Sequence, residues 1–551
     1  FSPQDRNYVF ELADARNKWA HQGTFSSDDA LRVLDSAERL LESFGDQDNR
    51  LAIQELRRGL MRQVIEGEAR SERRRTAKAP TEGEPQAGLA SWRDIVAPHD
   101  DVASGRLTQA EFAADLSLVA TGKAGTEYQD PKAFFARTYL TTRLTGLLTE
   151  AALRLSGRGG EPAIELQTNF GGGKTHALIA LYHLAGGTPV SELAGVAELL
   201  ERDGEELTLP ADIKRAVIVG PDISPTRPKA VADDIQLHTL WGHLAWHLGG
   251  REGYEMLRAA DEGVDGQRGD IDKPSLIKLF EFAGPSIILI DEWVAYARQL
   301  RDDNPGAGGS FGSQFTFAQA LLEAAAAVDN VMVLVTLPQS EVEVGGPQGV
   351  RALAELKEVT SRNAKKWLDQ QTDESFEIVR RRLFEPITAE NARIRDGVIR
   401  AFQEMYRNDQ KSFPAGCHDD NFRQRMEMSY PIHPELFDRL FEDWSTIEGF
   451  QRTRGALRLM SLVISELWNR GDTSLMIMPG TLPLDSGAVA AELRKHLEDG
   501  WDAVIQSNVD GPGALPTSLD QNNKHFGRLS ATRRVARSVY MGSAPRTDGS
   551  N

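Results

Sequence analysis

A glycine-rich segment that lies between an apolar run and a helical pattern constrains this chain more than any other feature. The apolar run covers residues 163–166, and the segment after it reads Thr168-Asn169-Phe170-Gly171-Gly172-Gly173-Lys174-Thr175. Glycines allow successive backbone N–H groups to turn inward around phosphate oxygens, and the helix that follows points its positive end at the same anion. The segment therefore predicts a phosphate-binding loop in a strand–loop–helix unit.

The residues at the end of this loop suit ATP and Mg²⁺ in particular. Lys174 supplies a positive charge to the β- and γ-phosphates, and Thr175 supplies a hydroxyl that can bind Mg²⁺. We expect every residue from Asn169 to His176 to contribute to the nucleotide site. The usual pattern opens with glycine where this chain has Thr168, so the loop should begin with a different turn geometry. The alternative is a flexible glycine turn beside an incidental Gly-Lys-Thr sequence.

Two acids that follow a second apolar run support the same interpretation. Residues 286–290 read as a buried strand that ends in Asp291 and Glu292. Ligands of parallel sheets collect at the carboxyl edge, where these acids would lie. Asp291 could hold Mg²⁺ through water, and Glu292 could accept a proton from the water that attacks the γ-phosphate. Without the phosphate loop, the same run would indicate only a strand end with solvated acids.

Two further polar residues stand where they could respond to the γ-phosphate. Thr336 follows the apolar run 331–335 and should lie beside the acids, where it would orient water or sense the phosphate. A capping threonine is the alternative. Arg454 opens the helical pattern 454–468 and could reach back to the γ-phosphate, which would couple the position of a helical lid to the nucleotide state. A surface salt bridge explains Arg454 equally well.

An arginine in the later part of the α/β pattern is a candidate arginine finger. Arg362 precedes a short apolar turn at Trp367 and Leu368 and a helix over 374–384. From that place its delocalised charge could enter the site of a neighbouring subunit and stabilise the transferring phosphoryl group. The run 380–382 is three arginines and competes for this role. Successive side chains on a helix point in different directions, so at least one of the three should be only solvated surface.

The distribution of apolar runs defines the fold class and the domains. Runs and helical patterns alternate from residue 163 to 335, which predicts an α/β fold with a mostly parallel sheet and helices on both faces. Helices over 7–22 and 29–44 are expected at the start, the second capped by Ser26 or Ser27 and stopped at Gly45. The expected domains are a helical domain over 1–70, a linker over 71–90, an ATPase core with an N-terminal helical extension over 91–390, a helical lid over 391–480 and an unassigned region over 481–551.

Composition limits the partners and the compartment. The net charge of −18 repels phosphate backbones, so contact with DNA or RNA would need a local basic patch. One candidate patch consists of Arg528, Arg533, Arg534 and Arg537. A solvated charged face is the simpler interpretation of these four. A single cysteine, Cys417, cannot form an internal disulfide and fits the cytoplasm. No apolar run approaches the roughly 20 residues of a membrane helix.

Taken in order, these elements resemble an AAA+ (P-loop) ATPase of the additional-strand type, in which Thr336 would be sensor 1 and Arg454 sensor 2. Five segments more narrowly resemble a family of large ATPases from bacterial anti-phage defence islands, and they cover 91–96, 110–116, 169–176, 430–436 and 450–457. Genes of that family often lie beside DNA methyltransferase and helicase genes. Its members are longer than this chain, whose two ends look cut. The resemblance implies a cytoplasmic bacterial homo-oligomer that uses ATP in defence together with such proteins.

The start of the chain carries a second resemblance. The segment Arg16-Asn17-Lys18-Trp19-Ala20-His21 resembles the Arg-Asn-three residues-His motif of HEPN domains, helical bundles that in many families dimerise and cut RNA. The resemblance implies that His21 moves the 2′-hydroxyl proton and that Arg16 supports the developing phosphorane charge. A bundle that serves only for dimerisation is the alternative. The domain would need more helix before Phe1.

Three functions remain open from the residues alone. The first is an ATPase that hydrolyses Mg-ATP to switch or remodel a defence complex, acting on or with nucleic acid. The second is an RNA-cleaving effector that ATP gates, with Arg16 and His21 as its centre. The third is a scaffold that binds ATP without hydrolysing it and uses the nucleotide to fix its shape.

Overall fold

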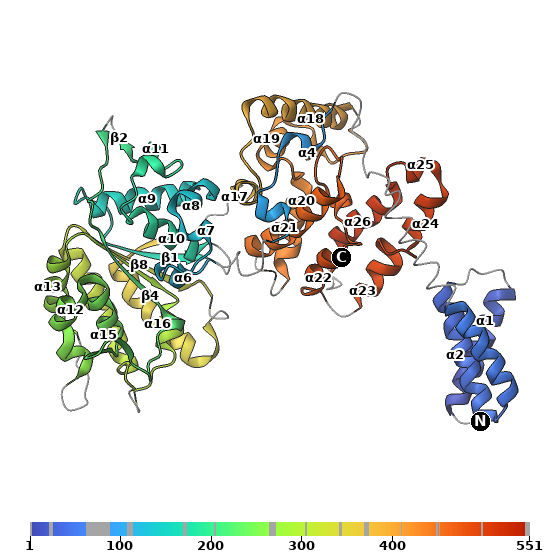
Figure 1. The fold of residues 1–551 in the computed structure, drawn as a ribbon, viewed down its shortest axis with the longest axis horizontal. Coiled ribbons are helices and arrows are strands. Elements are labelled where there is room, and N and C mark those ends of the chain that lie inside the picture. Colours follow the sequence, from blue (N-terminus) through green and yellow to red (C-terminus); the bar gives the residue numbers. More distant parts are fainter. Residues whose placement is uncertain are drawn as a thin grey trace. The chain divides into compact units, whose positions relative to one another are not determined.

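The computed structural model forms two compact units, one comprising Phe1–Glu82 and Ala503–Arg533 and the other Gly83–Asp502 and Arg534–Asn551 (Figure 1). The structure describes residues 3–20, 26–61, 89–106, 114–168, 173–202, 205–263, 271–302, 306–340, 344–368, 374–408, 410–447, 450, 452–497 and 500–545. Among the helices of these ranges, none has the length and apolar character needed to cross a membrane.

The chain opens with two helices, as predicted. They are α1 (Pro3–Ala20) and α2 (Ser27–Phe44). Ser26 caps α2 in a reciprocal capping box with Asp29, and α2 stops at Gly45, whose φ of 73° is the left-handed conformation that glycine adopts without strain. The rest of this unit is helical over residues 47–61, in α24 (Leu515–Asn522) and in α25 (Lys524–Gly527).

A five-stranded parallel sheet is the centre of the second unit, and it confirms the predicted mixed α/β class. Its strands are β1 (Ala163–Thr168), β4 (Lys214–Val219), β7 (Ser286–Asp291), β8 (Val331–Pro338) and β9 (Lys365–Leu368). Their order across the sheet is β4-β7-β8-β1-β9. The strand β8 therefore lies between β1, which leads into the glycine-rich segment, and β7, which ends in the acids.

The predicted apolar turn at Trp367 and Leu368 is wrong, because both residues belong to the edge strand β9. Two lysines open this short strand. An edge strand has one neighbour and meets solvent on its other side, so it lacks the continuous apolar pattern of β7.

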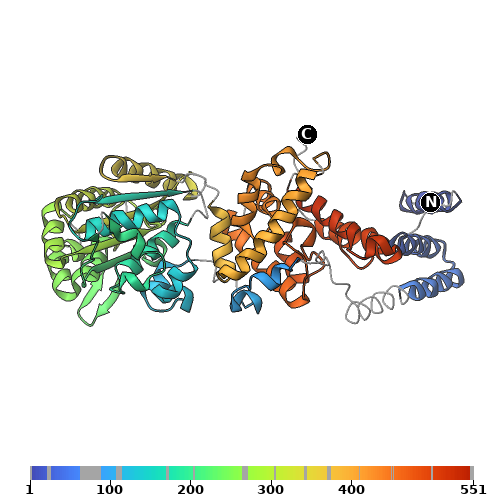
Figure 2. The ribbon, with the colours of Figure 1, turned by 90° about the horizontal axis from the view of Figure 1, so that it is seen from above.

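Side chains on the strands alternate between two cores. Ile288 and Val333 belong to one core, whereas Leu289 and Leu334 belong to the other. Helices cover both faces of the sheet, as expected (Figures 1 and 2). The face that carries Leu289 packs against α9 (Thr142–Leu155) and α10 (Lys174–Leu184). The opposite face packs against α13 (Lys273–Ala283), α15 (Phe311–Ala327) and α16 (Gly346–Asn363).

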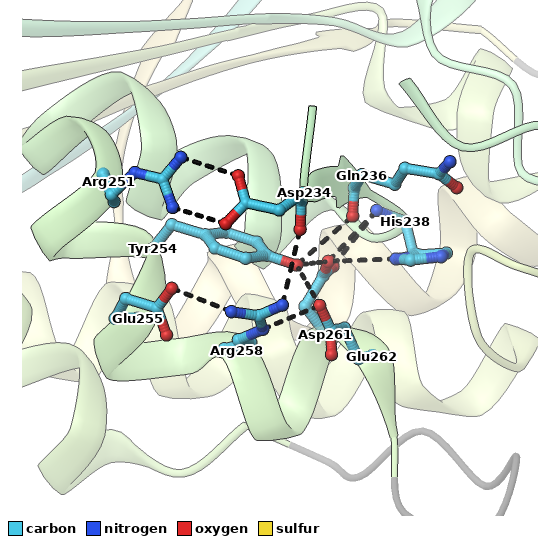
Figure 3. Close-up of polar contacts among 9 residues, drawn as sticks. All are labelled: Asp234, Gln236, His238, Arg251, Tyr254, Glu255, Arg258, Asp261 and Glu262. Atoms are coloured by element: carbon cyan, nitrogen blue, oxygen red, sulfur yellow. Dashed lines mark hydrogen bonds and ion pairs between the residues drawn. The ribbon is translucent and has the colours of Figure 1, made fainter. Parts of the chain in front are cut away.

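The segment between β4 and β7 folds back on itself. Its long helix α12 (Leu240–Glu262) is interrupted at Gly250, where φ is 57°. Asp261, buried near the end of the second arm, accepts a hydrogen bond from the Tyr254 hydroxyl (2.9 Å), as Figure 3 shows. It also accepts one from the Thr239 N–H (2.8 Å). The neighbouring hairpin consists of β5 (Lys229–Ala232) and β6 (Ile235–Leu237). The helical pattern over residues 239–248 predicts the first arm only.

Apart from the short antiparallel pair β2 (Glu201–Arg202) and β3 (Glu205–Glu206), most of the remainder of the second unit is helical. Its main helices are α17 (Ser375–Leu383), α18 (Ala389–Asn408), α19 (Asp420–Ser429), α20 (Pro434–Asp438), α21 (Arg452–Arg470), α22 (Gly487–Arg494) and α26 (Ala531–Ser543). The short helix α4 (Trp92–Ile95) also belongs here, because the Trp92 indole donates to Asp472 (2.8 Å) and packs against Trp468. The segment that was predicted as a helical extension of the core is thus packed into the helical region at this end.

Candidate functional site

The helix α10 begins at the carboxyl edge of the sheet, directly after the glycine-rich segment. Gly173 precedes it with a φ of 78°, a conformation that side chains rarely adopt, and Lys174 is the first helical residue. The first N–H groups of a helix have no partner within it, so this end of α10 is suited to an anion. Asn169 to Gly172 lie outside the described residues, and their predicted phosphate contacts stay predictions.

Three of the predicted site residues meet at this edge through their side chains. The Thr175 hydroxyl donates to Asp291 Oδ2 (2.8 Å), and the Thr336 hydroxyl donates to Asp291 Oδ1 (2.6 Å). Asp291 and Thr336 are almost fully buried. They come from β7 and β8, and Thr175 comes from the first turn of α10. The Asp291 carboxylate is therefore held between the helix that follows β1 and the strand that separates β1 from β7.

Glu292 stands at a strained turn next to this contact. Its φ of 53° is left-handed, which is uncommon outside glycine, and its N–H donates to Thr336 Oγ1 (3.0 Å). The end of β4 approaches so closely that a Cβ added at Gly220 would lie 2.1 Å from the Glu292 carbonyl oxygen. Thr336 therefore fixes both acids with one hydroxyl, and Gly220 leaves room for the turn.

Neighbouring charges act on the Glu292 carboxyl. Burial and then the charge of Asp291 raise the pKa of Glu292, whereas Lys174 and Arg298 act in the opposite direction. Lys174 is thus close enough to influence the acid electrostatically. A general base benefits from a raised pKa, because its proton affinity then approaches what the reaction requires near neutral pH.

The oxygen donors at this edge suit Mg²⁺, which does not need all of its ligands from the protein. Among the residues that the structure describes, no group of three or more His, Cys, Asp or Glu side chains could hold a metal ion. A hydroxyl and a carboxylate within 2.8 Å of each other, Thr175 and Asp291, are oxygen donors. Mg²⁺ prefers oxygen and usually keeps several waters and phosphate oxygens as its other ligands.

The His176 side chain packs against a neighbouring helix. Its ring packs on Phe134 of α8 (Pro131–Arg137), with 4.6 Å between centroids, and its Nε2 lies 3.1 Å from Thr138 Oγ1. Burial, and then the charge of Arg382, lower the pKa of His176 to about 3. The ring is therefore neutral at physiological pH. The backbone N–H of His176 stays in the first turn of α10.

The candidate arginines differ in their surroundings. Arg362 is exposed in the last turn of α16, where it pairs with Glu358 (2.5 Å). Arg382 is buried, and Arg380 pairs with Glu377 of its own helix. Arg381 donates to the Ala136 carbonyl (3.1 Å). Each of the three consecutive arginines is buried or half-buried, whereas Arg362 is exposed at the end of α16.

Arg454 lies in the first turn of α21, half-buried, and its charge acts on Tyr128 of α7 (Thr126–Gln129). Tyr128 in turn meets the His176 ring edge-on, with 6.2 Å between centroids. Arg454 is therefore close to the helix that follows the phosphate loop.

The predicted basic patch is largely internal. Arg537 is fully buried and lies 3.8 Å from Asp485, whereas Arg533 pairs with Asp510 (2.7 Å). Arg534 donates to Ser474 Oγ (2.9 Å). These three side chains are buried or half-buried, whereas Arg528, the fourth of the predicted patch, is exposed. Helical periodicity alone does not show which partners other segments bring to these three arginines.

Of the predicted HEPN pair, Arg16 and His21, only Arg16 lies among the described residues. Arg16 is exposed on α1, where its guanidinium donates to Asn17 Oδ1 (3.0 Å). His21 lies outside the described residues.

Sequence reasoning missed Gly220 and Arg298. Gly220 follows β4 as Asp291 ends β7, so its place at the carboxyl edge could have been recognised from the strand pattern. Arg298 follows the short helix α14 (Trp293–Ala297), and no local pattern indicates that its charge reaches Glu292.

Comparisons with protein families found matches over three ranges of the chain. Residues 95–359 match the model of the DUF499 N-terminal domain, and residues 370–546 match that of the DUF499 second domain. Residues 1–45 match the Swt1-like HEPN model. No curated protein matches the chain. The two DUF499 ranges divide between 359 and 370, upstream of the predicted boundary at 390.

Proposed function

We propose that this chain, which carries both DUF499 domains behind a Swt1-like HEPN segment, binds and hydrolyses Mg-ATP as an AAA+ ATPase of the additional-strand type. The contact of Thr175 and Thr336 with the two oxygens of Asp291 carries the proposal. The strand order supports it, because β8 lies between the strand of the glycine-rich loop and the strand of the acids.

Each residue has a role that follows from its place. Lys174 and the N–H groups at the start of α10 would bind the triphosphate, and Thr175 and Asp291 would hold Mg²⁺. When bound, Mg²⁺ would neutralise charge on the phosphate oxygens. Glu292 would accept the proton of the attacking water. Thr336 would hold Asp291 and Glu292 in their positions relative to each other.

Turnover would require a second subunit in this scheme. Arg362 is exposed at the end of α16, where it can enter a neighbour's site and stabilise the transferring phosphoryl group. We therefore propose a homo-oligomer. We further propose that it switches or remodels a bacterial anti-phage defence complex, with DNA methyltransferase- or helicase-type proteins and nucleic acid as partners. This part rests on the resemblance of the segments quoted from the sequence.

Glu292→Gln tests the proposed chemistry. The variant should bind ATP as the unchanged protein does but should release phosphate at least about 100-fold more slowly, because the water loses its base. Lys174→Ala is the matched control, since it should lose ATP binding as well. Unaltered phosphate release by Glu292→Gln would remove that residue from the role. Tight ATP retention without phosphate release by the unchanged protein would favour the scaffold.

A second candidate function rests on the Swt1-like HEPN match and the exposed Arg16. We propose RNA cleavage gated by ATP as the alternative activity. Labelled RNA should be incubated with the chain and with His21→Ala, each with and without Mg-ATP. Absence of His21-dependent cleavage under both conditions would reject it.

A further inference from the structure

The short helix α7 is attached to the helix that follows the phosphate loop at two points. The Tyr128 carbonyl accepts a hydrogen bond from His183 Nε2 (2.8 Å), and the Tyr128 ring meets His176. His176 and His183 lie about two turns apart on one side of α10. The two contacts connect α7 to the first and the last turn of α10.

His176 is well suited to transmit a movement of α10, because its ring is fixed. The Thr138 hydroxyl donates to the Phe134 carbonyl (2.7 Å), so its oxygen is left to accept from His176 Nε2 (3.1 Å). His176 Nε2 is thereby the donor in this contact. His176 follows Thr175 directly, so the residue proposed to bind Mg²⁺ and the fixed ring share one turn of helix.

Arg382 holds the other side of α7. Its guanidinium pairs with Glu127 (2.6 Å) and lies over the Tyr128 ring at 4.8 Å. The side chain of Arg382 is only 7% exposed. A buried charge-assisted pair combined with a cation–π contact is directional, so it fixes the relative position of the two helices.

These contacts join the two family domains. Glu127, Tyr128 and His176 lie in the range of the DUF499 N-terminal domain, whereas Arg382 lies on α17 in the range of the second domain. The helix α17 packs on α19 and α21. Arg454 of α21 also acts on Tyr128 electrostatically. Tyr128 therefore contacts both the phosphate-loop helix and the second domain.

We propose that Arg382 is a positioning residue that couples the phosphate-loop helix to the helical second domain through Tyr128 and His176. Binding of a nucleoside triphosphate orders the first turn of α10, α7 follows, and Arg382 then holds α17 in place. This inference rests on the proposed ATP binding at the same loop. It also separates Arg382 from the exposed Arg362, because a buried arginine that is paired within its subunit cannot enter a neighbour's site.

Hydrogen exchange of the full chain, with and without Mg²⁺ and a non-hydrolysable ATP analogue, tests the coupling. In the unchanged protein the analogue should slow exchange in peptides of both α10 and α17. In Arg382→Gln the slowing in α10 should persist, and the slowing in α17 should fall by about fivefold or more, the lower end of typical coupling between sites. Glu127 keeps Arg137 at 3.0 Å, so the variant retains a partner for the buried acid.

Matched variants separate coupling from general loosening of α17. Arg380→Gln removes a charge from the same helix, where Arg380 pairs with Glu377, and should leave the slowing in α17 unchanged. Arg382→Lys keeps the positive charge but lacks the planar guanidinium that lies over Tyr128. It should restore part of the slowing of exchange in α17. If Arg382→Gln does not fold, Glu127→Gln weakens the same pair and should lower the slowing in α17.

Two results would overturn the inference. One is equal slowing in α17 for Arg382→Gln and Arg380→Gln, whether both keep it or both lose it. The other is an analogue that slows α10 but not α17 in the unchanged protein. An analogue that leaves α10 itself unaffected would instead contradict the proposed function.

Discussion

Replacing Thr336 by valine removes the contact that holds the two acids together. The substitution keeps the shape of the side chain, but Asp291 loses a hydrogen bond of 2.6 Å and the Glu292 N–H loses its acceptor. A hydrogen bond to a charged group contributes about 1.5–3 kcal/mol, and an unsatisfied buried donor costs about 1–3 kcal/mol. Thr175 still donates to Asp291, so the combined loss of free energy should fall in the lower half of the range that these two contributions span. We expect β7 and β8 to lose about 3 kcal/mol of unfolding free energy.

Native-state hydrogen exchange of β7 and β8 peptides in increasing urea measures this free energy locally, which matters because the chain has two units. Thr360→Val is the matched control. Thr360 is equally buried, but its hydroxyl donates within α16 to the Leu356 carbonyl (2.9 Å), so its loss should cost less than about 1 kcal/mol. Thr336→Ser should stay close to the unchanged protein. Equal losses for the two valine variants would refute the reasoning.

Four further outcomes follow from the same geometry. In Gly220→Ala the added Cβ would lie 2.1 Å from the Glu292 carbonyl oxygen, so the turn that carries Glu292 must shift. The variant should lower kcat about tenfold or more without changing ATP affinity, which steady-state kinetics and equilibrium binding measure. The raised pKa of Glu292 should move the acid limb of the kcat–pH profile above that of an ordinary glutamate, and a limb at the ordinary position would contradict it. Burial lowers the pKa of His433 from 6.5 to about 4, so the unfolded state binds more protons between these values and stability should fall as the pH drops through them; His433→Gln should flatten part of that fall in thermal unfolding. Arg362→Ala should abolish most turnover, and mixing it with Lys174→Ala subunits should restore some, whereas no recovery would argue against a finger supplied by a neighbour.

The strongly patterned parts of the fold were open to prediction from the sequence. The strands β1, β4, β7 and β8 and the start of α10 lie where apolar runs and glycines placed them, because buried parallel strands read as continuous apolar segments. The edge strand β9 was missed since Lys365 and Lys366 interrupt that signal. The return arm of α12 was missed because only the glycine at the fold marks it.

The candidate site was predictable in its residue types but not in its contacts. Thr175, Asp291 and Thr336 follow from loop and strand-end positions. The buried partners of Arg382 and Arg537 do not, because Glu127 and Asp485 lie far from them in the chain and only tertiary packing brings each pair together. Charge patterns on one helix therefore overestimated the basic surface near the end of the chain.

Calorimetric titration of Mg-ATP into the full chain, beside the same titration of Lys174→Ala, tests the central claim most directly. We predict a binding heat with one ATP per chain for the unchanged protein and no detectable heat for the variant. Excess EDTA should lower the affinity of the unchanged protein for ATP, because binding depends on Mg²⁺. A flat titration of the unchanged protein, or equal affinity in the variant, would contradict the assignment of this loop as a triphosphate site.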